Sequence, residues 1–257
     1  MKLFIMGAGR MGSWLAETLT PFHEVCIFDP WGVRLKEDSK VVRMGDLSEV
    51  ESLRPEMVIN AASLHHTRQA FEAVLPFLPP DCLLADIASV KTDFQELYRE
   101  LGKRFVSSHP MFGPTFTGFR NLEGEHAILI RESCEEGKAF FRDFYQGLGL
   151  HVQEYSFEEH DETIAYSLSI PFASSMVFAA SMKKQAAPGT TFKKHLTVAR
   201  ALLSEDDHLL AEIMFNPNTI RQLERINSQL TYLTHIIRGR DYEEMKKFLD
   251  KLRENIE

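Results

Sequence analysis

The chain has 257 residues, of which 44% are hydrophobic and 26% are charged, a composition typical of a folded globular protein. This length is sufficient for two modest domains. The formal net charge of −8 argues against nucleic acids and anionic membranes as general partners, because both require a basic surface, and it favours a small-molecule ligand.

Short apolar runs alternate with amphipathic segments through the first half of the chain. The runs have the length and composition of buried strands and fall at 2–6, 24–28, 56–61, 82–87, 104–107, 127–130 and 152–155. Helices are expected between them at 10–19, 67–78 and 136–148. This alternation predicts an α/β fold in which residues 1–155 form a Rossmann-type, doubly wound and mainly parallel sheet.

A glycine-rich loop, GAGRMG at 7–12, follows the first predicted strand and opens the first predicted helix. In such a loop Gly7 permits a tight turn, Gly9 lets the backbone approach a pyrophosphate, and Gly12 lets helix and strand pack closely. The amides of Arg10 and Met11 begin the helix, where the dipole favours negative charge. The strand–loop–helix context therefore predicts a site for a nicotinamide dinucleotide.

An acidic residue, Asp29, ends the second predicted strand about 20 residues after Gly9. A carboxylate at this point accepts hydrogen bonds from the adenosine ribose and repels a 2′-phosphate, so NAD is favoured over NADP. Two observations leave alternatives open. Asp29 also begins an Asp29–Pro30 turn, and the nearby Arg34 leaves room for NADP.

Two polar clusters follow neighbouring predicted strands, DIASVK at 86–91 and SSHPMFGP at 107–114. Ligands of open parallel sheets lie beyond the carboxyl ends of the strands, where these clusters stand. Pro110 cannot donate to a sheet ladder, so it is expected to end the strand and to hold His109 at the rim of the cleft. From spacing alone, a catalytic histidine and a structural one remain equally open.

After His160 the pattern becomes helical only, which predicts an all-helical second domain over 156–257. Helices are expected at 161–184, 190–203, 206–215, 218–238 and 241–255. Asp206 and Asp241 stand at two expected helix starts, and Gly239 stands just past an expected helix end. The stretch 163–182 has no charged residue and is long enough to span a bilayer, but five serines and Pro171 favour a helix packed against other helices.

The cysteines and histidines give no other strong pattern. Cys26, Cys82 and Cys134 are far apart and lack metal-site spacing, so we expect reduced thiols and a cytoplasmic protein. The N-terminal apolar run is too short for a signal peptide. The adjacent pair His65 and His66 has no third ligand at suitable spacing, and no metal site is expected.

The order and spacing of three motifs resemble those of the prephenate dehydrogenase family. They are DIASVK at 86–91, HPMFGP at 109–114, and EHD at 159–161 before an uncharged helix. The resemblance covers nearly the whole chain. It implies the oxidation of prephenate, or of its amino counterpart arogenate, with NAD(P) and loss of carbon dioxide on the way to tyrosine.

The same resemblance implies roles for individual residues. His109 would polarise the substrate hydroxyl or accept its proton, and Ser89 would bond that hydroxyl or the histidine. Lys91 would steer the cofactor or the dicarboxylate substrate, or would cap the following helix from solvent. His160 and Asp161 match a family pair that gates or orients the site, although Asp161 alternatively serves as a helix N-cap.

A substrate with two carboxylates also needs a cationic anchor, which the family takes from an arginine of the helical domain. Arg200 is our choice, with Lys193 and Lys194 earlier on the same predicted helix; an exposed helix arginine is the alternative. The stretch 167–172, SLSIPF, lacks the two histidines of the SHLPH pattern found in many relatives, so no substrate contact is assigned there.

The sequence therefore predicts an NAD-dependent prephenate dehydrogenase that forms a homodimer through its helical domain. The dimer rests on the serine-rich apolar helix and on the resemblance. An arogenate dehydrogenase is the first alternative. A catalytically silent dinucleotide-binding sensor is the second, and the presence of Ser89 and His109 argues against it.

Overall fold

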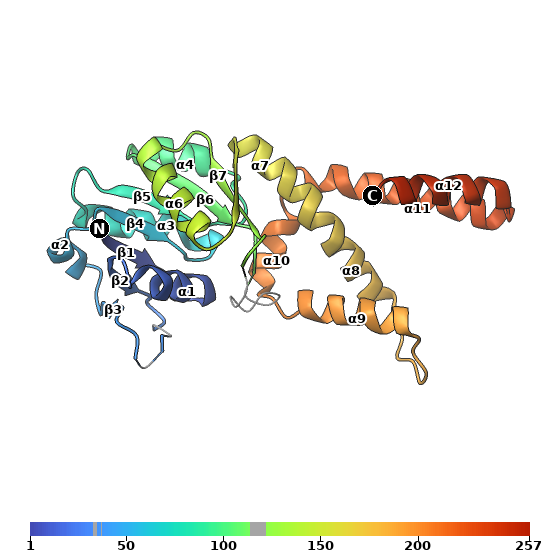
Figure 1. The fold of residues 1–257 in the computed structure, drawn as a ribbon, viewed down its shortest axis with the longest axis horizontal. Helices are drawn as coiled ribbons and strands as arrows, with labels where there is room; N and C mark the ends of the chain where they lie inside the picture. The colour runs from blue at the N-terminus through green and yellow to red at the C-terminus, as the bar shows by residue number, and fades with distance from the viewer. Residues whose placement is uncertain (33–34, 37, 114–121) are drawn as a thin grey trace.

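A computed structural model describes residues 1–32, 35–36, 38–113 and 122–257. Its described strands form one eight-stranded sheet in the order β3-β2-β1-β4-β5-β6-β7-β8 (Figure 1). All neighbours are parallel except β6 and β7. In chain order the strands are β1 (Lys2–Met6), β2 (Glu24–Phe28), β3 (Val42–Arg43), β4 (Met57–Asn60), β5 (Leu83–Asp86), β6 (Phe105–Pro110), β7 (His126–Ile130) and β8 (His151–Tyr155). The predicted doubly wound, mainly parallel α/β fold is confirmed.

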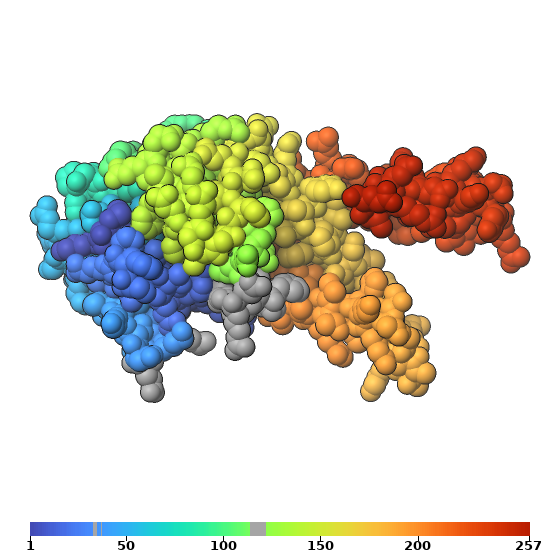
Figure 2. Space-filling view, viewed as in Figure 1, coloured from blue at the N-terminus to red at the C-terminus, as the bar shows by residue number. Residues whose placement is uncertain are grey.

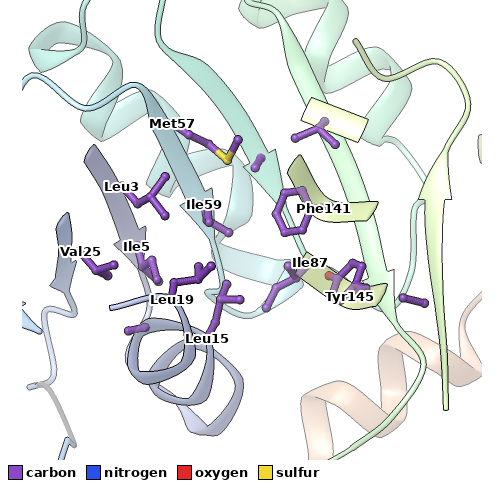
Figure 3. Close-up of a cluster of buried hydrophobic side chains, with 14 of the residues drawn as sticks. Leu3, Ile5, Leu15, Leu19, Val25, Met57, Ile59, Ile87, Phe141 and Tyr145 are labelled. Atoms are coloured by element: carbon purple, nitrogen blue, oxygen red, sulfur yellow. The ribbon is translucent and has the colours of Figure 1, made fainter. Parts of the chain in front are cut away.

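Helices cover both faces of the sheet. On one face α1 (Arg10–Leu19) and α6 (Glu135–Gly147) bury Leu15 and Phe141 against β1, β4 and β5 (Figure 3). On the other face lie α2 (Glu49–Leu53), α3 (Leu64–Val74) and α4 (Phe94–Leu101), and they bury Val50, Phe71 and Tyr98. Strands buried on both faces are continuously apolar, which is why their positions could be predicted.

The chain reverses its strand order between β1 and β4, and the glycine loop lies at this switch point. Gly7 has φ +97°, and a Cβ there would stand 2.6 Å from the backbone nitrogen of Ala62, just after β4. A Cβ on Gly12 would stand 2.0 Å from the carbonyl oxygen of Gly7. Loop, helix and neighbouring strand therefore approach too closely for any side chain at these two positions.

Only helices follow β8, and they extend away from the sheet (Figures 1 and 2). They are α7 (Phe157–Ile164), α8 (Ile170–Ser181), α9 (Thr190–Leu202), α10 (Asp207–Met214), α11 (Thr219–Gly239) and α12 (Tyr242–Glu254). Ser156 and Glu159 form a capping box at the start of α7, and Asp206 and Asp241 cap α10 and α12 with their side chains. The hairpin of α11 and α12 forms the end of the molecule farthest from the sheet.

Several elements differ from expectation: the helix expected at 67–78 is α3 at Leu64–Val74, and β3, α2 and α4 were not expected. Two further differences have a local reason. The single helix expected at 161–184 is two α-helices joined by a π-helical turn at Ala165–Ser169, and Pro171 lies in the first turn of the second helix. Proline has no N–H to continue the α-helical bonds, and a widened turn accommodates that loss. Strand β6 runs through Pro110 instead of ending before it, because by then β5 has stopped and β6 pairs only with β7.

Replacing Gly12 tests the close approach at the switch point. We expect Gly12→Ala to lower the free energy of unfolding by about 3 kcal/mol, because its Cβ would overlap the Gly7 carbonyl. Gly9→Ala is the matched control: a Cβ on Gly9 meets nothing within 4 Å, so its cost should stay below about 1 kcal/mol. Urea unfolding measures the free energy of unfolding of both variants, and equal losses of this free energy would contradict the prediction.

Candidate active site

A cavity of about 240 Å³ lies between the carboxyl edge of the sheet and the helical part of the chain. From the sheet it is lined by Ser89, after β5, and by His109, in β6. From the helices it is lined mainly by apolar side chains, among them Leu168, Phe172 and Ile213. The cavity therefore joins the two polar clusters predicted from the sequence to an apolar wall supplied by the second half of the chain.

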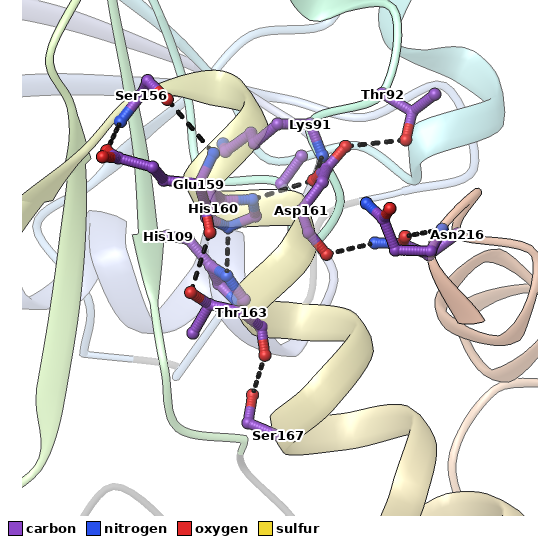
Figure 4. A network of polar contacts seen from close by, with 12 residues as sticks. Lys91, Thr92, His109, Ser156, Glu159, His160, Asp161, Thr163, Ser167 and Asn216 are labelled. Carbon is purple, nitrogen blue, oxygen red and sulfur yellow. Dashed lines mark hydrogen bonds and ion pairs between the residues drawn. The ribbon is translucent and has the colours of Figure 1, made fainter. Parts of the chain in front are cut away.

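A chain of hydrogen bonds connects His109 to a buried carboxylate (Figure 4). His109 Nδ1 lies 2.9 Å from His160 Nε2, and His160 Nδ1 lies 2.9 Å from Asp161 Oδ1. A carboxylate only accepts, so His160 Nδ1 donates to it, and Nε2 of a neutral His160 must accept. His109 Nδ1 then donates to His160. The relay leaves the lone pair of a neutral His109 on Nε2, as a proton acceptor requires.

Burial sets the proton affinity of both histidines. It lowers the pKa of His109 well below the ordinary 6.5, and the nearby His160 and Lys91 lower it further. Burial also lowers the pKa of His160, against the opposing effect of its bond to Asp161. Both rings are therefore neutral at neutral pH, as the relay requires.

Asp161 is held by groups that follow β5. Its Oδ1 accepts from the backbone N–H of Lys91 at 2.9 Å, and its Oδ2 accepts from Thr92 Oγ1 at 2.8 Å. Burial alone would raise the pKa of Asp161, but the bonds from His160, Lys91 and Thr92 keep it below the usual value. The N-cap alternative for Asp161 is wrong, because Ser156 caps α7.

Lys91 lies beneath the site with a side chain that is 0% exposed. Its amino group pairs with Asp86 and donates to the carbonyl oxygen of Ser108 at 2.8 Å. Tyr98 donates to the other oxygen of Asp86 at 2.7 Å. A solvent-exposed helix cap is therefore excluded for Lys91. Its ammonium instead ties β5 to the residue preceding His109.

Ser89 shares the cavity with His109, but no hydrogen bond joins the two among the described residues. The tautomer of His109 is set by His160, because His160 occupies the Nδ1 position. Of the two alternatives for Ser89, contact with a substrate hydroxyl is therefore the one that the geometry leaves available. Among the described residues, Ser89 is connected to His109 only through the cavity that both residues line.

The expected cationic anchor does not reach the cavity. Arg200, Lys193 and Lys194 are exposed on α9, and none belongs to the described cavity lining. The chain from α9 to α10 instead contributes Leu202 and Glu205. Arg200 remains a proposal that requires movement of its side chain or of the helices.

Asp29 supports the glycine loop from the end of β2. Its Oδ2 accepts from the backbone N–H of Ala8 at 2.7 Å, and its Oδ1 accepts from the N–H of Trp31 at 2.9 Å. Asp29 thus fixes both the loop and the following turn. Arg34, considered for NADP, and Pro114, the last residue of the second motif, lie outside the described residues.

The loop has room for a phosphate where a dinucleotide would need it. The Cβ position of Gly9 is open to 4 Å on an otherwise crowded loop, and Gly9 immediately precedes the N-terminal residues Arg10 and Met11 of α1. A backbone without a side chain and a helix N-terminus together suit a pyrophosphate. The residues present therefore fit a bound dinucleotide.

Two acidic residues of the cavity were missed by sequence reasoning. Glu125 comes from the turn before β7, and Glu205 from the turn between α9 and α10. Both lie in polar loop segments where charged residues are common, so neither has a local signal. The pairing of β7 with β6 brings Glu125 to the cavity, and the docking of the helices against the sheet brings Glu205 there.

The glycine loop at a Rossmann switch point, with a histidine relay at the same sheet edge, places this chain in the class of Rossmann-type nucleotide-binding folds. Comparison with known families gives a more particular result. Residues 37–128 match the family described as prephenate dehydrogenase, nucleotide-binding domain. The match covers that stretch of the chain, and the resemblance to this family predicted from the motifs is confirmed.

Individual relatives agree with this assignment. The T-protein of Enterobacter agglomerans is 26% identical over 192 residues, covering 69% of this chain and 49% of that protein. A probable arogenate/prephenate dehydrogenase of Methanocaldococcus jannaschii is 24% identical over 211 residues, covering 76% of this chain and 46% of that protein. This chain thus spans about half the length of these two relatives.

A solved structure shows the same fold over the whole chain. Prephenate dehydrogenase from Aquifex aeolicus, in complex with hydroxyphenyl propionate and NAD⁺, aligns with a TM-score of 0.81 at 21% identity. The alignment covers 100% of this chain and 98% of that one. The all-helical part is therefore shared in fold as well as the sheet.

Removing the buried ammonium tests the support beneath the site. We expect Lys91→Met to cost about 3–5 kcal/mol of unfolding free energy, because it leaves the Asp86 carboxylate buried without its cation. The double variant Asp86→Asn with Lys91→Met should cost less than Lys91→Met alone. Lys246→Met, at an exposed position on α12, is the control. Urea unfolding that shows equal losses for Lys91→Met and Lys246→Met would refute this role.

Proposed function

We propose that this chain catalyses the NAD-dependent oxidative decarboxylation of prephenate or of its amino counterpart arogenate. The observation that carries the proposal is the relay, which leaves His109 Nε2 as a proton acceptor in the cavity at the carboxyl edge of the sheet. The glycine loop lies at the same edge. The motif resemblance and the family match over 37–128 support this choice of substrates.

In the proposed reaction a hydride leaves the ring carbon that bears the hydroxyl, and a proton leaves the hydroxyl oxygen. Bound NAD would supply the hydride acceptor. His109 takes the hydroxyl proton as the hydride leaves. The bond from the ring to its carboxylate then breaks, carbon dioxide departs, and the electron pair enters the ring, which becomes aromatic. The proton on His109 returns to the oxygen, so that a phenol, carbon dioxide and reduced cofactor result.

The proposed role of this chain is alignment and proton transfer, since aromatisation favours the loss of carbon dioxide. Asp161 stabilises the positive charge that His109 gains, through the intervening ring of His160. Ser89, which lines the sheet side of the cavity together with His109, is the proposed partner of the substrate hydroxyl. The apolar helical wall excludes water from the ring.

We propose NAD as the cofactor. Gly9 offers room for the pyrophosphate, and Asp29 at the end of β2 places a negative charge where a 2′-phosphate would otherwise stand. The solved structure from Aquifex aeolicus contains NAD⁺, which supports this choice.

We also propose a soluble homodimer formed through the helical part. The stretch Phe157–Ser181 is long and apolar enough to cross a membrane, with mean hydropathy 1.4, and only 22% of its most apolar window is buried. Tyr166 and Val177 on this stretch are 58% and 62% exposed. Covering such a surface with a second copy of the same helices would remove it from water.

Turnover tests the reaction directly. The intact chain should reduce NAD with prephenate or arogenate, and His109→Asn should lower kcat at least about 100-fold by removing the proton acceptor. His235→Asn, exposed on α11, is the matched control and should retain the rate. No turnover with either substrate would refute the proposed function, and full activity of His109→Asn would refute the role of the relay.

The pH dependence of kcat/KM gives a second test of His109 as the proton acceptor. Because the folded-state pKa of His109 lies well below 6.5, His109 stays neutral as the pH falls to 6.5. We expect kcat/KM to remain level down to about pH 6.5 and to decline only below it.

Sedimentation tests the dimer. The chain should sediment at twice its own mass of 29.5 kDa, and Val177→Glu should yield monomers with unchanged circular dichroism, because Val177 is exposed in a single copy. Val42→Glu, 53% exposed on the distant edge strand β3, should leave the dimer intact. A monomeric native chain would contradict the proposal.

A further inference from the structure

The cavity beside His109 is acidic. Glu125 and Glu205 both line it, and its described lining includes no lysine or arginine. Neither carboxylate has a hydrogen-bond or ion-pair partner among the described residues, and both side chains are half-buried. Two carboxylates without a protein partner in one cavity are available to a cationic group of a ligand.

Glu205 is the better placed of the two. Its backbone N–H bonds the carbonyl of Leu202 at 3.1 Å, which fixes it where α9 ends. From there its side chain crosses to the sheet, and Oε1 lies 3.9 Å from the Cβ position of Gly113. Gly113 is four residues after His109, in the same motif. The carboxylate of Glu205 thus lies beside the motif that carries His109, and both residues line the cavity.

These charges distinguish between the two substrates of the proposed function. Prephenate carries a keto group and two carboxylates, so it enters as a dianion without any positive group. Arogenate carries an ammonium in place of the keto group and has one unit less of net negative charge. Carboxylates of the protein repel the first more strongly and pair with the ammonium of the second.

We propose that Glu205 binds the substrate ammonium and makes this chain selective for the amino acid arogenate over the keto acid prephenate. This inference rests on the proposed function. Glu125, from the sheet side of the cavity, adds a second negative charge that opposes the keto acid. The helical wall between them, including Phe172 and Leu209, receives the ring and keeps the local dielectric low.

The test compares both substrates with the native chain and with variants of Glu205. We expect native kcat/KM to be higher for arogenate. Glu205→Gln should shift the arogenate-to-prephenate ratio of kcat/KM about tenfold towards prephenate, mainly through KM, because it removes the charge and keeps the shape. Glu205→Asp, which keeps the charge, should preserve the preference for arogenate.

Asp207→Asn is the matched control, since Asp207 is exposed on α10 and lies outside the described cavity lining. It should leave the ratio unchanged. A merely structural Glu205 would lower both rates together when replaced by Gln, and that result would overturn the inference. A native preference for prephenate would also overturn it while leaving the proposed function intact. Turnover of neither substrate would instead refute the proposed function itself.

Discussion

The bond from the Lys91 backbone N–H to Asp161 joins the sheet to the helices at the point where both contribute to the site. Asp161 orients His160, which orients His109, so one carboxylate determines which nitrogen of the reacting ring holds the lone pair. The same lysine holds the β6 backbone through the carbonyl of Ser108. Lys91 thus supports both the position and the tautomer of His109, although it is not itself part of the described cavity lining.

Other contacts across this junction place the helices against the sheet. Asn216, just before α11, donates to the backbone carbonyl of Asp161 at 3.0 Å, and Glu212 on α10 accepts from the N–H of His65 at 3.0 Å. The helices that supply the apolar wall are thus fixed through the residue that sets the relay. Rotation of the helical part would disturb both the apolar wall and the two histidines, so the cavity and the histidine relay form one structural unit.

Strands and caps could be predicted because their causes are local. The runs at 2–6 and 24–28 match β1 and β2 because sheet burial requires continuous apolar residues, and Asp206 and Asp241 cap helices from their own sequence positions. The contact between Lys91 and Asp161 could not be predicted, because the two residues lie 70 positions apart and spacing does not reveal burial. The family motifs contain residues that the fold brings together, but only the fold shows that Lys91 lies beneath the site.

The balance of charge around His109 explains why its supports are buried. Burial makes the histidine a weak base, so it is neutral when a substrate arrives, yet the proposed reaction requires it to hold a proton briefly. Asp161 offsets that transient charge through His160, while the charge of Lys91, which opposes it, is already paired with Asp86. The carboxylates of Glu125 and Glu205 line the same cavity as His109. A cavity that carries negative charge thus favours both a protonated histidine and a substrate with a positive group, and one electrostatic arrangement serves proton transfer and selectivity together.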